Sequence, residues 1–307
     1  MIVGITGATG FIGKALMDEC VKRGFETRVL TRSKSKLHLI PSSVRVFFGD
    51  LIDENYNPSN FVNNLDVLYN CAGEINDESK MYNLHVNGTK KLLNSASGKI
   101  GNWVQLSSVG VYGVCRDGII TENSKEQPLG VYERSKAESD NIVKNSSIPY
   151  VILRPSNVFG SNMPNQSLKG LLNAVRKGLF FFTGKENKSL VNYIHVDDVV
   201  NALVRCGSDE KSLGEVFNLS QSTTVEKMIA SFSSGIKSNK KILRFPEGVV
   251  RVVVGIFGWI SRFPLTSSRV DALTGRCIYD STKIQKTLGF KYSTTLEKGL
   301  KLFSKHQ

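Results

Sequence analysis

Residues 1–13 read MIVGITGATGFIG, and this stretch decides the fold. Residues 1–6 are almost all apolar and rich in β-branched side chains, as in a buried strand. Gly7, Gly10 and Gly13 follow at three-residue spacing and lead into a helix-like stretch. Such a turn lets the backbone approach a pyrophosphate and directs helix N-terminal amides at it. The stretch predicts a dinucleotide-binding turn, with a purely structural glycine turn as the alternative.

Beyond this turn, short apolar runs alternate with longer stretches of helical periodicity. Strand-like runs occupy 1–6, 26–31, 44–49, 66–70, 103–108 and 149–155, and helix-like stretches occupy 11–24, 79–96 and 132–145. This alternation predicts an α/β fold, a Rossmann-type doubly wound parallel sheet with helices on both faces. We expect residues 1–155 to form the dinucleotide-binding domain, joined by segments near 190–207. Residues 156–307 should mainly form a smaller C-terminal substrate-binding lobe over the carboxyl edge of the sheet.

The composition is that of a globular protein, with 40% hydrophobic and 22% charged residues among 307. The five cysteines are scattered without a Cys-x-x-Cys pair, and the four histidines lack metal-ligand spacing, so we expect no disulfide framework and no metal. The net charge of +13 comes from dispersed lysines, which favours an anionic cofactor or substrate, or simply a solvated surface, over nucleic acid. Because the first predicted strand begins at residue 1, we expect no leader segment and a cytoplasmic location.

Residues 248–260, GVVRVVVGIFGWI, form the most hydrophobic stretch. The stretch is shorter than the ~20 residues that a bilayer-spanning helix needs, and Arg251 interrupts it. No transmembrane segment is therefore expected. We expect a buried helix of the lobe, with a helix lying on a membrane surface as the alternative.

The end of the second predicted strand bears on the choice of cofactor. NAD-binding folds usually have an acidic residue there, which binds the ribose hydroxyls. In this chain Thr31 occupies that place and Arg32 follows. An arginine beside a hydroxyl can bind a 2′-phosphate through charge-assisted hydrogen bonds, whereas a carboxylate would repel it. We therefore expect NADPH rather than NADH, unless Arg32 only points into solvent.

Further motifs follow the glycine turn in a fixed order. They are GDL at 49–51, NCAG at 70–73, NLHVNGT at 83–89, QLSSVGVYG at 105–113, YERSK at 132–136, LRPSNVFG at 153–160 and YIHVDDVV at 193–200. In this order the chain resembles, essentially end to end, the extended short-chain dehydrogenases/reductases. The resemblance is to the branch of nucleotide-sugar epimerases, dehydratases and ketoreductases.

Two Tyr-x-x-x-Lys pairs are present, Tyr132 with Lys136 and Tyr279 with Lys283. The first follows Ser108 at the spacing of the family, so the resemblance implies that Ser108, Tyr132 and Lys136 are catalytic and Tyr279 is structural. Moving a tyrosine pKa from about 10 to near neutrality takes about 4 kcal/mol. One positive charge ~4 Å away supplies about that much at an effective dielectric near 20. We therefore expect Lys136, helped by the cationic oxidised nicotinamide, to lower the Tyr132 pKa in a sheltered cleft.

The resemblance also implies roles for other residues. Tyr132 would protonate the nascent alkoxide while Ser108 hydrogen-bonds the substrate oxygen. The expected cofactor contacts, besides Arg32, Tyr132 and Lys136, are Gly7, Thr9, Gly10, Phe11, Ile12, Gly13, Asp50, Leu51, Ala72, Gly73 and Asn87. The expected substrate contacts are Asn157, Arg176 and Arg269. His195, Asp197 and Asp198 are expected to cap a helix, without a catalytic role.

The chain departs from the family pattern at two places. Many nucleotide-sugar enzymes have an arginine before the YIHVDD-like strand, where this chain has Val191 and Asn192. The dehydratases have an acid directly after the catalytic hydroxyl, where this chain has Val109 and Gly110. Dehydration is therefore not expected.

We interpret the chain as an NADPH-dependent reductase of a keto group on a nucleotide-activated sugar, such as a 4-keto-6-deoxy sugar in bacterial polysaccharide or O-antigen synthesis. The alternatives are a nucleotide-sugar 4-epimerase with tightly bound NAD and a reductase of a non-sugar ketone. A non-catalytic module that senses NADP(H) or associates with nucleic acid is a further alternative from another functional class. Family members often dimerise, so a homodimer is possible.

Overall fold

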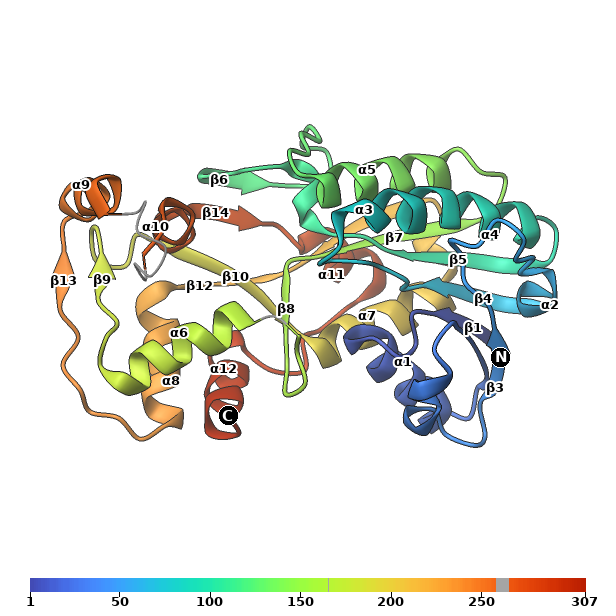
Figure 1. Cartoon of the computed structure of the whole chain (residues 1–307), viewed down its shortest axis with the longest axis horizontal. Coiled ribbons are helices and arrows are strands. Elements are labelled where there is room, and N and C mark those ends of the chain that lie inside the picture. Colours follow the sequence, from blue (N-terminus) through green and yellow to red (C-terminus); the bar gives the residue numbers. More distant parts are fainter. Residues whose placement is uncertain (165, 258–264) are drawn as a thin grey trace.

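A parallel sheet forms the centre of the computed structural model, which describes residues 1–164, 166–257 and 265–307 (Figure 1). Within these residues the sheet has seven strands: β1 (Ile2–Thr6), β2 (Glu26–Thr31), β3 (Arg45–Phe48), β4 (Leu65–Asn70), β5 (Ile100–Leu106), β7 (Tyr150–Pro155) and β11 (Glu215–Leu219). Their spatial order is β3-β2-β1-β4-β5-β7-β11, and every pairing is parallel. The order reverses between β1 and β4, as in a doubly wound sheet. The predicted fold class is confirmed.

Helices cover both faces of this sheet. In Figure 1, α4 (Gly88–Ala96) and α5 (Val131–Lys144) lie above the sheet, and α1 (Phe11–Lys22) and α7 (Val196–Ser208) lie below it. The short helices α2 (Ser59–Val62) and α3 (Glu78–Tyr82) and the π-helical turn η2 (Asn83–Asn87) belong to the upper layer. The lower core includes Leu16, Met17 and Leu203, and the upper core includes Leu92, Trp103 and Ile152, all fully buried. Burial of these two helix layers fixes the positions of the strand ends.

Strand β11 joins the sheet although it lies far beyond residue 155, where we expected the first domain to end. Its residues pair in register with β7, from Glu215 opposite Val151 to Leu219 opposite Pro155. Helix α11 (Thr282–Leu288) then packs against β11. Residues of the second half of the chain therefore complete both the sheet and its cover.

Among the described residues, the lobe contains three small sheets and a group of helices. Its strands are β8 (Asn157–Phe159), β10 (Leu190–His195) and β12 (Gln221–Thr224) in one sheet, β9 (Phe182–Thr183) with β13 (Arg244–Phe245), and β6 (Asp117–Ile120) with β14 (Arg276–Tyr279). Its helices are α6 (Gln166–Lys177), α8 (Val225–Gly235), α9 (Glu247–Phe257), α10 (Ser267–Thr274) and α12 (Leu296–Lys305). Leu172, Met228, Phe232 and Leu300 form the centre of its core. Figure 1 shows the lobe at the left, beyond the carboxyl ends of the main strands.

Helix α9 corrects one expectation. The stretch at 248–260 was expected to be a buried helix, but only Val250 and Val254 of α9 are buried. Val249 is 53% exposed and Val252 is 61% exposed. The expectation is wrong because the helix packs on one side only; the last part of the stretch, 258–260, lies outside the described residues. No described helix is long and apolar enough to cross a membrane.

Candidate active site

The glycine turn between β1 and α1 is built by close backbone approach. Gly7 has φ +69°, and a Cβ there would lie 2.5 Å from the carbonyl oxygen of Cys71. A Cβ on Gly13 would collide with the Gly7 carbonyl oxygen. The packing of the protein itself therefore requires both glycines, whether or not a ligand binds.

Gly10 differs from these two glycines because it is exposed and leaves the start of α1 open. It is the N-cap of this 12-residue helix, no side chain caps the helix, and the first turn contains no acidic residue. Uncapped amides and the positive end of the helix dipole favour an anionic group at this place. The turn thus fits the pyrophosphate of a dinucleotide, with Thr9, Phe11 and Ile12 around it.

A buried polar network fixes the neighbouring strand ends. The Thr6 hydroxyl donates to Asn70 Oδ1 at 2.7 Å and accepts a hydrogen bond from the Ala72 amide at 3.1 Å. The Asn70 amide nitrogen in turn donates to Gln105 Oε1 at 3.0 Å. These bonds tie together the carboxyl ends of β1, β4 and β5. They hold the loop with Ala72 and Gly73, the predicted cofactor contacts, in one conformation.

The region of the predicted 2′-phosphate contact lies after β2. The Arg32 guanidinium is 3.4 Å from the Asp50 carboxylate, and both side chains are partly exposed. The next residue of the Gly-Asp-Leu motif, Leu51, is buried. Arg32 thus stands beside Asp50 rather than extending alone into solvent, and the two residues lie close enough to contact one ligand.

Ser108, Tyr132 and Lys136 meet where β5 ends. Ser108 follows the strand and caps the short 3-10 turn η3 (Val109–Tyr112), accepting from the Gly110 amide at 3.0 Å. Tyr132 is in the first turn of α5, and its phenol lies near enough to Ser108 for the serine side chain to lower the tyrosine pKa. The Lys136 ammonium, one turn further along α5, donates to the Leu106 carbonyl oxygen at 2.9 Å. The three predicted catalytic residues therefore converge.

Burial dominates the electrostatics of Tyr132. Burial raises the pKa of Tyr132 to about 12, the nearby Ser108 side chain acts in the opposite direction, and the charges of Glu133 and Asp140 add to the rise. Burial also lowers the pKa of Lys136, against the opposing charges of Asp140 and Cys71. In the protein alone desolvation dominates the Tyr132 pKa, and the lowering expected from Lys136 together with the oxidised nicotinamide stays a prediction. Tyr132 is thus a protonated phenol at neutral pH.

His85 is a neighbour of these residues that the sequence reasoning missed. It lies in the π-helical turn η2 and is 2% exposed. Its Nε2 accepts from the Glu74 amide at 2.9 Å, so Nδ1 has the proton and donates to the Ser135 hydroxyl at 2.8 Å. The Ser135 hydroxyl donates to the Tyr132 carbonyl oxygen at 2.9 Å.

The ring of His85 also stands edge-on to the Tyr132 ring, with centroids 5.7 Å apart. Burial, followed by the charge of Lys136, lowers the pKa of His85 to about 3, so the imidazole is neutral. His85 therefore connects the loop after β4 to the first turn of α5. The position of His85 in the NLHVNGT motif was the only signal of this role in the sequence. Asn87, which was expected to contact the cofactor, is exposed, and its amide donates to Asn83 Oδ1 at 3.1 Å.

A buried ion pair attaches α5 to the central sheet. The Arg154 side chain, 1% exposed, contacts the fully buried Asp140 carboxylate at 2.9 Å and Glu126 at 2.6 Å. Asp140 also accepts from the Ser107 hydroxyl at 2.8 Å. These bonds attach α5 to the ends of β5 and β7. Ser107 thus has a supporting role beside Ser108.

The second tyrosine–lysine pair lies elsewhere. Tyr279 packs against the small cluster of Val111 and Tyr112. The Lys283 ammonium pairs with the Glu215 carboxylate at 2.6 Å and lies over the Phe217 ring. Both residues have structural contacts of the expected kind.

The predicted substrate contacts are spread over the lobe. Asn157, on β8, is exposed and donates to the Asn192 carbonyl oxygen at 3.2 Å. Arg176 is exposed near the end of α6, and Arg269 is in the first turn of α10. Both arginines belong to helices of the lobe, and their substrate roles stay predictions. As expected, His195 caps α7, and Asp198 accepts from Ser293.

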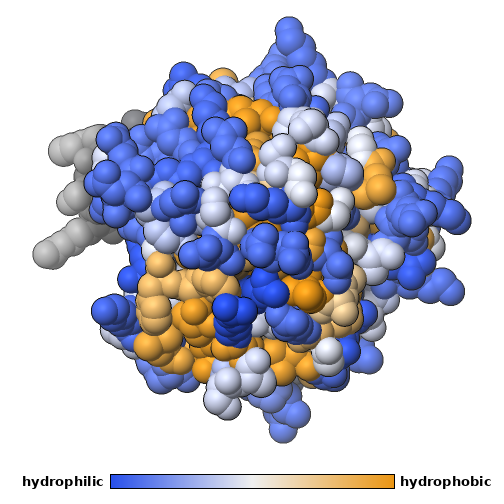
Figure 2. All heavy atoms as spheres, turned by 90° about the vertical axis from the view of Figure 1, so that its right-hand side faces the viewer, coloured by the Kyte–Doolittle hydropathy of each residue, from blue (hydrophilic) through white to orange (hydrophobic). Residues whose placement is uncertain are grey.

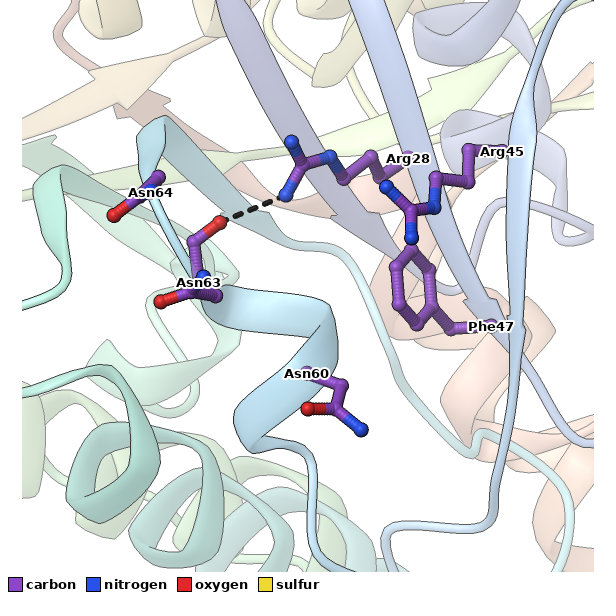
Figure 3. A pocket seen from close by; sticks show the side chains of 6 residues that line it. All are labelled: Arg28, Arg45, Phe47, Asn60, Asn63 and Asn64. Atoms are coloured by element: carbon purple, nitrogen blue, oxygen red, sulfur yellow. Dashed lines mark hydrogen bonds between the residues drawn. The ribbon is translucent and has the colours of Figure 1, made fainter.

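Two cavities lie apart from these residues. The first, of about 350 Å³, is lined by Arg28, Arg45, Phe47, Asn60, Asn63 and Asn64 (Figure 3). It lies between α2 and the amino ends of β2 and β3, at the end of the molecule that Figure 2 presents. The second, of about 530 Å³, is lined by Gly184, Lys185, Arg244, Phe245, Pro246, Glu247 and Arg276 of the lobe. Among the described residues, no His, Cys, Asp and Glu side chains are grouped to bind a metal.

Comparison with known proteins agrees with this arrangement. The model of the NAD-dependent epimerase/dehydratase family matches residues 3–220, more than two thirds of the chain. The chain belongs to this family. The predicted recognition of an extended short-chain dehydrogenase/reductase is thereby confirmed, and the protein is an enzyme of that type.

Individual relatives of this family member are distant. The low-salt glycan biosynthesis protein Agl12 of Haloferax volcanii is 24% identical, with 89% of this chain and 92% of the relative covered. A UDP-glucose 4-epimerase of Vibrio cholerae is 25% identical, with 97% and 92% covered. The solved UDP-glucuronic acid 4-epimerase of Bacillus cereus in complex with NAD superimposes with a TM-score of 0.76 at 19% identity, with 100% and 96% covered. The structural likeness shows the fold.

Proposed function

We propose that this member of the epimerase/dehydratase family reduces a keto group on a nucleotide-activated sugar with NADPH. The observation behind the proposal is the convergence of Ser108, Tyr132 and Lys136 at the carboxyl end of β5. A protonated phenol beside a serine hydroxyl is the arrangement needed to hold and then protonate a carbonyl oxygen. A 4-keto-6-deoxy sugar of bacterial polysaccharide or O-antigen synthesis is the proposed substrate.

Each residue has a separate task in this reaction. Bound NADPH would supply the hydride. The Ser108 hydroxyl donates a hydrogen bond to the substrate oxygen and orients it toward Tyr132. The Tyr132 phenol then gives its proton to that oxygen as negative charge develops there. Lys136 is placed to stabilise the phenolate that remains, because its ammonium lies one helical turn away in a desolvated site.

The proposed preference for NADPH is supported by Arg32 after β2 and by the position of Thr31 where an acid is usual. Asp50 weakens this support because its carboxylate, 3.4 Å from Arg32, would repel a 2′-phosphate. Arg32 would have to exchange its contact with Asp50 for the phosphate. Relative affinity for the two cofactors therefore tests the proposal directly.

The decisive experiment supplies nucleotide-linked 4-keto-6-deoxy sugars to the purified protein and follows absorbance of NADPH and of NADH. Consumption of NADPH with formation of a reduced sugar nucleotide is expected. The non-sugar alternative would be favoured if no keto-sugar nucleotide is turned over while a ketone without a nucleotide diphosphate is reduced. The ketone without a nucleotide diphosphate is an informative control, because Val191 stands where many nucleotide-sugar enzymes have an arginine.

A 4-epimerase is the second candidate, because the Vibrio cholerae relative of that name spans 97% of this chain. The epimerase uses its cofactor catalytically and returns it to the starting state. Extraction of the purified protein separates the two functions. Tightly retained NAD together with interconversion of sugar epimers, without net consumption of NADPH, would favour the epimerase.

A further inference from the structure

The end of the lobe farthest from the dinucleotide-binding turn has an exposed apolar surface. We define the α9 face as Leu243, Phe245, Val249, Val252 and Val253, which are 36–61% exposed. Val249, Val252 and Val253 stand at helix spacings of three and four, so they form one stripe of α9. Most of the other side of this helix is packed, because Val250 and Val254 form a small cluster with Val270. Apolar side chains on more than one side of a helix are normally buried, so among the described residues the α9 face lacks the cover it would need.

The chain segment that contains the α9 face is basic. Residues 237–257 contain five cations, Lys237, Lys240, Lys241, Arg244 and Arg251, and one acid, Glu247, so the segment has a net charge of +4. The cavity of about 530 Å³ adjoins the start of α9, and Lys185 and Arg276 are among the residues that line this cavity. Ion pairs of Arg244 with Glu226 and of Arg251 with Glu247 and Asp271 balance part of this charge. Lys240 and Lys241 form no ion pair with a carboxylate among the described residues, and the Lys240 ammonium donates to the Arg176 carbonyl oxygen at 2.8 Å.

We propose that the α9 face docks on the surface of an anionic phospholipid membrane. The valine and leucine side chains would enter the boundary between headgroups and acyl chains, and the flanking lysines would contact lipid phosphates. An apolar stripe with a basic border is the pattern of a helix that lies in the membrane interface. The 11-residue length of α9 suits lying on a bilayer and is too short for crossing it.

Two other occupants fit less well. A second copy of this chain would bring a further charge of +13 to the contact, and like charges oppose association. A protein partner would be expected to bind through tyrosine, tryptophan or arginine anchors, whereas valine and leucine are under-represented among interface hot spots. The α9 face is mainly aliphatic, which suits lipid.

Figure 1 shows what docking would do to the orientation of the enzyme. The helix α9 is at the extreme left of the molecule, and the sheet with the glycine turn extends away to the right. With the α9 face on the membrane, the cofactor-binding domain would point away from the bilayer, and the lobe would lie next to it. This proposal does not depend on which ketone or sugar the active site accepts.

Sedimentation of the full chain with vesicles tests the proposal. Vesicles of phosphatidylcholine mixed with phosphatidylglycerol should bind the protein. Vesicles of phosphatidylcholine alone should bind it at least about tenfold more weakly. Binding should fall as salt is raised. The double variant Val249→Ser/Val252→Ser should reduce binding about tenfold or more because it removes apolar area from the contact. The variant Lys240→Glu/Lys241→Glu should reduce binding to anionic vesicles only.

The matched control is Leu302→Ser, which removes an exposed leucine from α12 and should leave vesicle binding unchanged. Thermal unfolding should show that all variants are folded, as expected for exposed positions. Equal binding of wild type and Val249→Ser/Val252→Ser would overturn the proposal. Failure of the wild type to bind anionic vesicles would also overturn it. A lipid-free dimer that the same double variant dissociates would also overturn it, since the face would then join two copies.

Discussion

The imidazole of His85 and the hydroxyl of Ser135 lie 2.8 Å apart in the interior, although fifty residues separate them in the chain. Through this bond and the bond from the Glu74 amide, the loop after β4 and the helix with Tyr132 share one buried side chain. A neutral imidazole is needed at this place because Nε2 must accept a hydrogen bond while Nδ1 donates one. The requirement connects the geometry of the site with the pH dependence of folding.

His85→Gln should make the stability of the protein less sensitive to acid. The His85 pKa is about 3 in the folded protein and about 6.5 when unfolded, so below pH ~6.5 only the unfolded chain gains this proton. The wild type therefore loses stability from this group as the pH falls from ~6.5 toward 3. Urea unfolding at a series of pH values should show a shallower loss for His85→Gln. His306→Gln, at the exposed C-terminus, is the control; an equally shallow profile for it would contradict the assignment.

Some features of the site could be predicted from the sequence, whereas others, including the role of His85, could not. The glycine turn, the six strand-like runs and the meeting of Ser108 with Tyr132 follow from local patterns and motif order. The role of His85 could not be predicted, because it depends on contacts with the Glu74 amide and Ser135 from other elements. The direction of the Lys136 ammonium was equally hidden, since the nearby Leu106 carbonyl offers it a buried acceptor.

Two features of the fold escaped the sequence for the same reason. β11 has only five residues in an irregular part of the chain, so its place beside β7 depends on tertiary pairing. The exposure of α9 also escaped the sequence, because apolarity alone does not reveal how many sides of a helix find a partner. Local pattern identified the elements, whereas the number of neighbours of each element depended on the whole fold.

Loss of the buried arginine should destabilise the fold strongly. Arg154→Leu would leave Asp140 buried without its cation, which costs about 3–5 kcal/mol. The control Arg205→Ala breaks the partly exposed pair with Asp209 and should cost less than about 1 kcal/mol. Urea denaturation of both variants measures the difference. Equal losses would show that the Arg154–Asp140 pair contributes no more than a surface pair.

Arg32→Ala should affect the two cofactors unequally. If Arg32 binds a 2′-phosphate, its loss should raise KM for NADPH by about tenfold or more, because a charge-assisted hydrogen bond is lost. KM for NADH should change by less than about twofold, since NADH has no such phosphate. Arg45→Ala is the control, because Arg45 begins β3 at the amino end of the sheet. Equal effects of Arg32→Ala on both cofactors would refute the proposed preference.

Tyr132→Phe should remove most of the reductase activity, lowering kcat by about 10²–10⁴-fold, since a general acid is lost while the ring remains. Tyr279→Phe is the matched control from the second Tyr-x-x-x-Lys pair and should retain wild-type kcat. With a pKa of about 12, Tyr132 stays protonated through neutral pH, so its titration should not reduce kcat/KM for reduction between about pH 6 and 9. Steady-state rates across this range measure both effects. Full turnover by Tyr132→Phe would show that another group donates the proton.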